Sequence, residues 1–117
     1  FMLNVPPDKR GLINENDVNR LKKFKQAIDS IFCTDMALNA SATSSDVRFN
    51  DAKKYGAINV VDGNPESYWA TNDGETKGSF EIDLGSAKIF DVISLQEYIK
   101  LGQRVSKFNV EAWYNNE

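Results

Sequence analysis

The chain has 117 residues, of which 41% are hydrophobic and 26% charged, a composition typical of a globular protein of one domain. It contains no histidine, which excludes Ser-His-Asp and Cys-His catalysis and histidine-ligated zinc or haem. A single cysteine cannot form an intrachain disulfide. Fourteen basic and seventeen acidic residues give a net charge of −3, which argues against a nucleic-acid partner. No apolar run is long enough for membrane insertion.

The first part of the sequence predicts one amphipathic helix. A short apolar run ends at a proline pair and a turn at 8–11, and from 18 to 32 apolar residues recur at helical spacing. Asn14 or Asn16 is available as the N-cap. The basic run 22–25 falls mainly on the polar side of this helix, which favours a solvated face over a nucleic-acid patch.

After Thr34 the helical period fails, and the rest of the sequence predicts strands and turns. A short strand is expected at 67–71, and residues 80–84 alternate between apolar and polar side chains, as in a strand with one buried face. Residues 89–95 form a more continuous apolar run, and residues 108–114 alternate again. Short strands behind a single helix favour a mainly β fold, a sandwich or jelly roll with a helical lead-in.

Glu81 and Asp83 are carboxylates that share one face of the expected strand. The other face of that strand is apolar, so the carboxylates are expected on its solvent side. Both carboxylates are therefore interpreted as ordinary surface charges, and no acid–base pair for hydrolysis is predicted here.

The segment 59–67 contains a turn rich in oxygen ligands. Asp62, Asn64 and Ser67 place a carboxylate, an amide and a hydroxyl oxygen around Gly63, where main-chain carbonyls can join them. Such a donor set suits a hard cation, Ca²⁺ before Mg²⁺. The alternative is a plain Asx turn without an ion, and the spacing alone favours the plain turn.

A second cluster contains aromatic and planar polar side chains of the kind that bind sugars. An aromatic face packs on the C–H face of a sugar ring, while Arg, Gln and Glu hydrogen-bond adjacent hydroxyls. The candidate carbohydrate-binding residues are Glu97, Tyr98, Gln103, Arg104 and Tyr68, with Trp69 as a possible neighbour. For Trp69 a packed position is favoured. For Glu97 and Arg104, a structural ion pair that pins the loop is an equal alternative.

Two stretches of the sequence resemble parts of a known family of glycosidases. The opening segment 1–17, FMLNVPPDKRGLINEND, followed by Leu21 in the helix, closely resembles the last strand-turn-helix portion of the catalytic domain of retaining α-L-fucosidases of the glycoside hydrolase family 29 type. From Asn39 onward the sequence resembles the discoidin-type module, also called F5/8 type C, that many of these enzymes carry next. Its matching stretches are 60–64, 69–71, 80–85, 95–97, 102–104 and 108–113.

This resemblance implies a fold and its division. Residues 1–34 are expected to be the C-terminal strand-turn-helix of a glycosidase catalytic domain. Residues 35–117 are expected to form an incomplete discoidin-like jelly-roll β-sandwich, of the galactose-binding-like type, that lacks its closing strands. The open edges of such a sandwich are expected to destabilise an independent monomer or to pair with another copy.

The resemblance also favours a cation at the turn over a plain turn. It implies that Asp62, Asn64 and Ser67, with the carbonyl of Asn59, are ligands of a structural Ca²⁺. The final acidic ligand of the family comes from the closing strand, beyond the last residue of this sequence, so the site is expected to be incomplete and weak.

The function implied is that of a non-catalytic carbohydrate-binding or accessory module of an enzyme that hydrolyses terminal α-L-fucose from glycans. Both catalytic carboxylates of the family lie upstream in the barrel, so this chain alone is expected to be inactive. The expected partners are fucosyl or galactosyl glycans and the catalytic domain of the same protein, in a bacterial periplasm, on the cell surface or secreted. The alternative is a purely structural module that braces the catalytic domain and binds no glycan.

Overall fold

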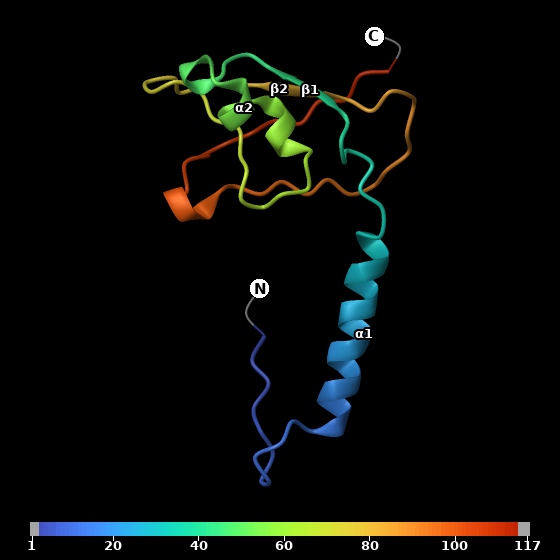
Figure 1. The fold of residues 1–117 in the computed structure, drawn as a ribbon. Coiled ribbons are helices and arrows are strands. Elements are labelled where there is room, and N and C mark those ends of the chain that lie inside the picture. Colours follow the sequence, from blue (N-terminus) through green and yellow to red (C-terminus); the bar gives the residue numbers. More distant parts are fainter. Residues whose placement is uncertain (1–2, 115–117) are drawn as a thin grey trace. The chain divides into compact units, whose positions relative to one another are not determined.

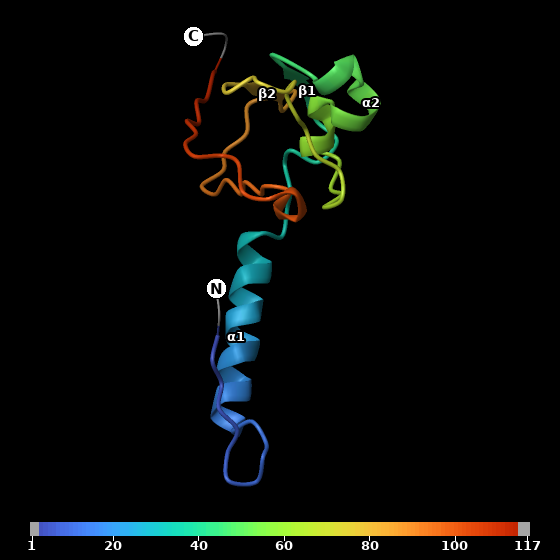
Figure 2. The ribbon, with the colours of Figure 1, turned by 90° about the vertical axis from the view of Figure 1, so that its left-hand side faces the viewer.

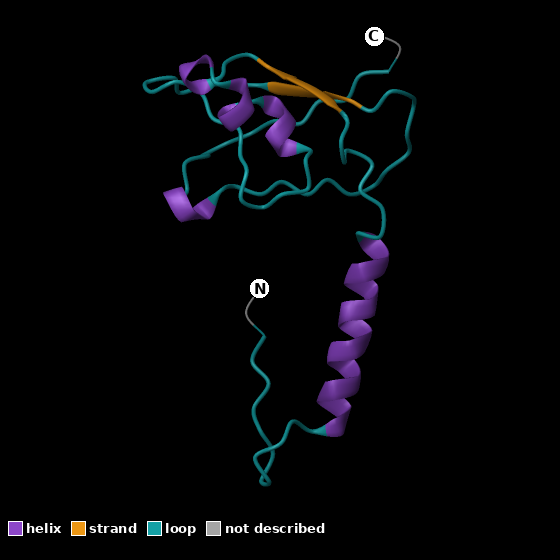
Figure 3. Cartoon of the chain, in the orientation of Figure 1, coloured by secondary structure: helices purple, strands orange, loops and turns teal. Residues whose placement is uncertain are grey.

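The computed structural model describes residues 3–114, and the chain divides into two compact units, Phe1–Asp35 and Met36–Glu117. The first unit holds the helix α1, Glu15–Ile31. The second holds a two-stranded sheet and several short helical turns. Figure 3 shows that loops make up most of this second unit. Among the residues that the structure describes, no helix is both long and apolar enough to cross a membrane.

The helix α1 begins at a capped N-terminus. The side chain of Asn14 accepts a hydrogen bond from the backbone N–H of Asn16 at 2.9 Å, which satisfies one of the free donors of the first turn. Glu15 and Asp17 place negative charge in that turn, where the helix dipole favours it. The predicted helix is therefore confirmed, with Asn14 rather than Asn16 as the cap.

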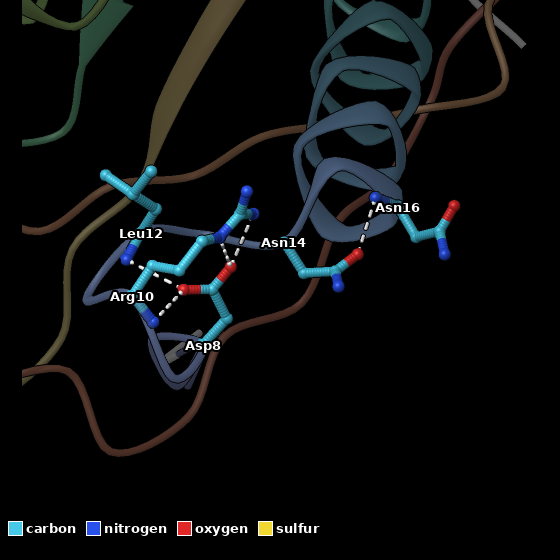
Figure 4. A network of polar contacts seen from close by, with 5 residues as sticks. All are labelled: Asp8, Arg10, Leu12, Asn14 and Asn16. Atoms are coloured by element: carbon cyan, nitrogen blue, oxygen red, sulfur yellow. Dashed lines mark hydrogen bonds and ion pairs between the residues drawn. The ribbon is translucent and has the colours of Figure 1, made fainter.

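The turn before α1 is built on Asp8. Its carboxylate accepts hydrogen bonds from the backbone N–H groups of Arg10 at 2.8 Å and Leu12 at 3.1 Å, and from the Arg10 side chain at 2.7 and 2.9 Å (Figure 4). The Arg10 guanidinium lowers the pKa of Asp8, and the Arg10 backbone N–H adds to this effect. At this turn the chain reverses direction, so that α1 runs opposite to the segment before the turn (Figure 1).

No residue of α1 is buried. Phe24, Ile28 and Ile31 lie at helical spacing and are 46%, 39% and 54% exposed. The apolar stripe predicted from the sequence is therefore present, and these three of its side chains are exposed in the described structure.

The sheet of the second unit pairs β1, Ser41–Ser44, with β2, Phe80–Asp83, in an antiparallel arrangement (Figures 1 and 2). In this register Ser41 lies opposite Asp83 and Ser44 opposite Phe80. Phe80 and Ile82 are half-buried while Glu81 and Asp83 are exposed, as the alternation predicts. This confirms the strand and places both carboxylates on its solvent side.

The core of the second unit is small and lies beside the sheet. Ala57 and Val61 are its buried hydrophobic residues within 3–114, at 5% and 3% exposure. Trp69 packs edge-on against Phe80, with ring centroids 5.4 Å apart. A Cβ at Gly78 would lie 2.7 Å from the Trp69 ring, so the glycine makes room for the indole. Trp69 is thus a packing residue, as expected.

A polar network fastens the segment after β1 to the segment before β2. The main-chain oxygen of Asp46 accepts a hydrogen bond from the indole N–H of Trp69 at 2.8 Å. Its carboxylate accepts two more from Asn72, from the backbone N–H at 2.7 Å and from the side-chain amide at 2.9 Å. The Asn72 side-chain oxygen in turn accepts from the Phe49 N–H at 2.8 Å. The bonds that Asp46 accepts are partly shielded from water, and those to its carboxylate are charge-assisted, so they fix both segments.

The described residues do not form the expected jelly-roll sandwich. Past Asp83, no strand occurs up to residue 114, so the segments predicted as strands at 89–95 and 108–114 have no sheet partner there. Their apolar side chains are correspondingly exposed, Ile89 at 95% and Trp113 at 68%. A period-2 pattern indicates which side chains share a face, but a strand also needs a neighbour for its backbone groups.

The expectation of strands and turns alone after Thr34 is also wrong. The chain forms a short helix, α2, at Ala52–Tyr55, and 3-10 helices at Arg48–Asn50, Ala57–Val60 and Ile99–Leu101. The side chain of Asp51 caps α2 by accepting from the N–H of Lys54. The strand predicted at 67–71 is likewise not part of a sheet in the described structure. Tertiary contacts override weak local preferences in such short segments.

Candidate functional site

The turn at Asp62–Ser67 is closed by its own side chains. One carboxylate oxygen of Asp62 accepts from the Asn64 N–H at 2.8 Å, and the other accepts from the Ser67 hydroxyl at 2.6 Å. The Asn64 side-chain oxygen accepts from the Glu66 N–H at 3.0 Å. Gly63 has a φ of 70°, the left-handed conformation that glycine adopts readily. Three of the predicted cation ligands are thus gathered in one turn.

These hydrogen bonds lower the pKa of Asp62. The bond from the Ser67 hydroxyl contributes most to this shift, and the bond from the Asn64 N–H contributes less. The carboxylate is therefore held in its charged form. Each carboxylate oxygen keeps a further lone pair, and the amide, hydroxyl and carbonyl oxygens nearby are neutral ligands, so the donor set fits a hard cation. Groups of three or more His, Cys, Asp or Glu residues that would bind a metal do not occur in the described part of the chain.

Asn59, the fourth predicted ligand, has a structural contact through its side chain. Its amide donates to the carbonyl of Lys54 at 2.9 Å and to the carbonyl of Tyr68 at 3.0 Å. It therefore connects the end of α2 to the segment that carries Tyr68, next to the Asp62 turn.

The loop of the sugar-binding candidates is closed by Glu97. One oxygen of its carboxylate accepts from the backbone N–H groups of Arg104 at 2.8 Å and Val105 at 2.7 Å. The Val105 N–H, and then the Arg104 N–H, lower the pKa of Glu97. Glu97 thus pins the loop, as one alternative proposed, but through backbone amides rather than through the Arg104 guanidinium.

The ends of this loop present exposed polar groups. The Arg104 guanidinium lies 3.4 Å from the carbonyl of Leu101. Gln103 is exposed beside it. Gly102 has a φ of 87°, which lets the chain turn at the end of the 3-10 helix. Lys100 donates to Glu66 at 2.6 Å, and this contact raises the pKa of Lys100.

Tyr68 and Tyr98 are stacked. Their ring centroids are 4.6 Å apart and the ring planes differ by 16°. The ring centroids of Tyr68 and Tyr55 are 5.7 Å apart, and those of Tyr55 and Phe49 are 6.3 Å apart. The four rings form a row that joins the 3-10 helix Arg48–Asn50 to the Glu97 loop.

The structure thus brings together the predicted residues in two neighbouring groups. Asp62, Asn64 and Ser67 share one turn, and the stack of Tyr68 on Tyr98 links that part of the chain to the Glu97 loop. Sequence reasoning missed the two residues that extend the row, Tyr55 and Phe49. It also missed the cations beside the rings: Arg48 at Phe49, Lys54 at Tyr55 and Lys100 at Tyr98. Ring contacts between residues far apart in sequence leave no local pattern that would have revealed them.

We expect the Glu97 carboxylate to titrate below 4.5, the usual pKa of glutamate. Because its pKa is lowered in the folded chain, its hydrogen bonds stabilise the loop fully above about pH 4.5, and this stabilisation is lost as the pH falls through the lowered pKa. An NMR titration of the Glu97 side chain, with hydrogen exchange of the Arg104 and Val105 amides, measures both effects.

The Glu97→Gln variant should lose this transition and exchange both amides faster at neutral pH. Glu111→Gln, a change at another exposed glutamate, should leave the exchange of these amides as it is. A Glu97 titration at or above 4.5, or unchanged exchange in Glu97→Gln, would contradict a pinning role.

Several known proteins resemble this chain. Residues 59–117 match the F5/8 type C family described as the NedA-like, galactose-binding domain. A putative α-L-fucosidase 1 of Oryza sativa subsp. japonica is 40% identical over 112 residues, and α-L-fucosidase 1 of Arabidopsis thaliana is 32% identical over 111. Both alignments cover 95% of this chain and 22% of the relative, so the chain spans only that share of the length of these relatives.

Among solved structures, a GH29 fucosidase of Ruminococcus gnavus, in complex with fucose, is 41% identical to this chain. The two superpose with a TM-score of 0.57 over 72% of this chain and 17% of that one. The resemblance to α-L-fucosidases and to the discoidin-type module is therefore confirmed. The chain belongs to the F5/8 type C family of NedA-like, galactose-binding domains.

Proposed function

We propose that the chain is a non-catalytic carbohydrate-binding module of an α-L-fucosidase, which holds the enzyme near fucosyl or galactosyl glycans. The observation that carries this proposal is the match of residues 59–117 to a galactose-binding domain family. The α-L-fucosidases that align over 95% of the chain suggest the kind of enzyme to which it belongs. The catalytic carboxylates are proposed to lie in another part of that enzyme, whose location is proposed to be periplasmic, cell-surface or secreted.

The proposed binding surface lies around the Glu97 loop. Tyr68 and Tyr98 are half-buried and stacked, so they form a rigid aromatic wall that loses little conformational entropy on binding. Gln103 and Arg104 offer planar donors for sugar hydroxyls. Glu97 positions this loop through its two backbone hydrogen bonds.

A structural role is the second candidate, and one observation favours it. The stripe of α1 formed by Phe24, Ile28 and Ile31 is exposed. Apolar faces of this kind are normally covered in a folded protein. In this alternative the chain braces the catalytic domain of its own enzyme and binds no glycan. Deleting it from the enzyme would then lower the unfolding temperature without changing retention on glycans.

A structural Ca²⁺ at the Asp62 turn is part of the proposal. The ligands would be Asp62, Asn64 and Ser67, with the main-chain carbonyl of Asn59. Affinity for Ca²⁺ depends on the number of charged ligands, and this set contains one carboxylate. The proposed site therefore binds weakly, with a dissociation constant on the order of 10⁻⁴ to 10⁻³ M.

Carbohydrate binding is tested by titrating methyl β-galactoside and methyl α-L-fucoside into the isotope-labelled chain. The amides of residues 97–104 should shift, with a dissociation constant on the order of 1 mM, or about −4 kcal/mol. Gln103→Ala should weaken binding, whereas Gln96→Ala, the same change outside the proposed surface, should not. Flat titrations against a broad glycan panel would overturn carbohydrate binding and leave the structural role.

For the cation, the unfolding temperature should rise with Ca²⁺ concentration, because an ion that binds only the folded state stabilises it by mass action. Asp62→Asn should lose this rise. Asp83→Asn is a matched control, since one oxygen of Asp83 accepts from the N–H of Gly85 at 2.7 Å in the same kind of turn. A rise that survives in Asp62→Asn, or no rise in the unaltered chain, would reduce the segment to a plain Asx turn.

A further inference from the structure

Aspartate is followed directly by glycine at two places in the second unit, Asp62 before Gly63 and Asp73 before Gly74. Such a pair is chemically labile, because glycine has no Cβ and its backbone nitrogen can approach the Cγ atom of the preceding aspartate. The two pairs have the same local chemistry, so a difference in their reactivity comes from the fold. The contacts of each carboxylate therefore decide which pair reacts.

The carboxylate of Asp62 is held by hydrogen bonds at both oxygens. One oxygen accepts from the Asn64 N–H at 2.8 Å and the other accepts from the Ser67 hydroxyl at 2.6 Å. Asp62 is half-buried, and a Cβ at Gly63 would lie 2.9 Å from the Leu38 side chain, so the turn is crowded. An attack on Cγ has to rotate the carboxylate and break both hydrogen bonds. The fold therefore protects this pair.

The carboxylate of Asp73 is held at one oxygen. That oxygen accepts from the Arg48 guanidinium at 2.8 Å, and within residues 3–114 no donor bonds to the other oxygen. The Asp73 side chain is 72% exposed, and an exposed ion pair restrains a side chain weakly. Gly74 has a φ of 91°, and a Cβ there would have no neighbour within 4 Å. The carboxylate and the Gly74 nitrogen therefore have room to meet.

The reaction between these two groups is intramolecular and consumes nothing except water, which is first released and then taken up. The Gly74 nitrogen attacks Cγ of the protonated Asp73 carboxyl. The new N–Cγ bond replaces a C–O bond, and the proton of the nitrogen leaves with the hydroxyl as water, which gives a cyclic succinimide. Water then adds at the main-chain carbonyl carbon of Asp73 and breaks the bond of that carbon to the Gly74 nitrogen. The product is isoaspartate, whose main chain runs through Cβ and Cγ.

We propose that Asp73 is a modification site, which converts spontaneously to isoaspartate in the folded chain while Asp62 does not. The conversion adds a methylene to the main chain at position 73 and moves the carboxylate relative to the Arg48 guanidinium. The side-chain oxygen of Asn72, the preceding residue, accepts from the Phe49 N–H at 2.8 Å. A longer main chain beside Asn72 loosens this hydrogen bond. The inference is independent of carbohydrate binding.

The test is peptide mapping of the folded chain after storage for weeks at neutral pH and physiological temperature. Electron-transfer mass spectrometry distinguishes isoaspartate from aspartate in each peptide. Isoaspartate at position 73 should exceed isoaspartate at position 62 by about tenfold or more, since two hydrogen bonds have to break at 62 and one exposed ion pair at 73. The same chain stored in concentrated urea should form similar amounts at both positions.

Two variants test the physical cause. Asp73→Glu keeps the charge but lengthens the side chain, which disfavours ring closure, so the stored variant should keep its Phe49 amide protected from hydrogen exchange. Ser67→Ala frees one oxygen of Asp62 and should raise isoaspartate at position 62 by about threefold or more. Ser86→Ala, the same change at an exposed serine outside the turn, should leave it unaltered.

Three results would overturn parts of this proposal. Equal amounts of isoaspartate at positions 62 and 73 in the folded chain overturn protection by the Asp62 turn. Isoaspartate that forms at 73 in urea but not in the folded chain overturns the modification site. Unaltered exchange of the Phe49 amide in the separated isoaspartyl form overturns the loosening of its hydrogen bond. All three leave the proposed function as it is.

Discussion

The second unit depends on the hydrogen bonds of Asp46. Ala57 and Val61 are the buried hydrophobic residues within 3–114, so apolar burial alone holds this part of the chain weakly. Asp46 compensates by accepting from the Trp69 indole through its main-chain oxygen and from Asn72 through its carboxylate. Removing the carboxylate would leave the Asn72 groups unpaired, which typically costs about 1 to 3 kcal/mol. One side chain thus joins the segment after β1 to the segment before β2.

This arrangement explains how a unit with so few buried hydrophobic residues among those described can keep its loops in fixed positions. The side chain of Asn72 is hydrogen-bonded both to Asp46 and to the backbone N–H of Phe49, so it connects the two. The Asn59 amide donates to the carbonyls of Lys54 and Tyr68 and so connects the end of α2 to the segment of Tyr68. Glu97 closes the loop after Tyr98 in the same way, through backbone amides. Polar side chains therefore hold these loops in fixed shapes, and under the proposed function a ligand would meet aromatic rings that are already ordered.

The sequence predicted what depends on neighbouring residues. The helix at Glu15–Ile31 followed from its apolar period and from Asn14, and the strand at Phe80–Asp83 followed from strict alternation. The sequence did not predict the position of Phe49. Its backbone N–H bonds to Asn72, which is 23 residues further along the chain. Phenylalanine also has no preference for a left-handed backbone that would have indicated a turn here. The sandwich was expected from a series of short strands, the last at 108–114, and from the family resemblance, yet alternation within a strand does not identify its pairing partner. For Glu97 the sequence left a sugar contact and an ion pair with Arg104 as equal alternatives. The carboxylate accepts from backbone N–H groups instead, and such partners leave no pattern in the sequence.

The central claim is that the network of Asp46 and Asn72, rather than a large apolar core, holds this part of the second unit in shape. The most direct measurement is the unfolding temperature of Asn72→Ala, recorded together with hydrogen exchange of the Phe49 amide. We expect the Phe49 amide to lose protection and the unfolding temperature to fall with it. An unaltered unfolding temperature in a variant whose Phe49 amide exchanges freely would contradict this claim.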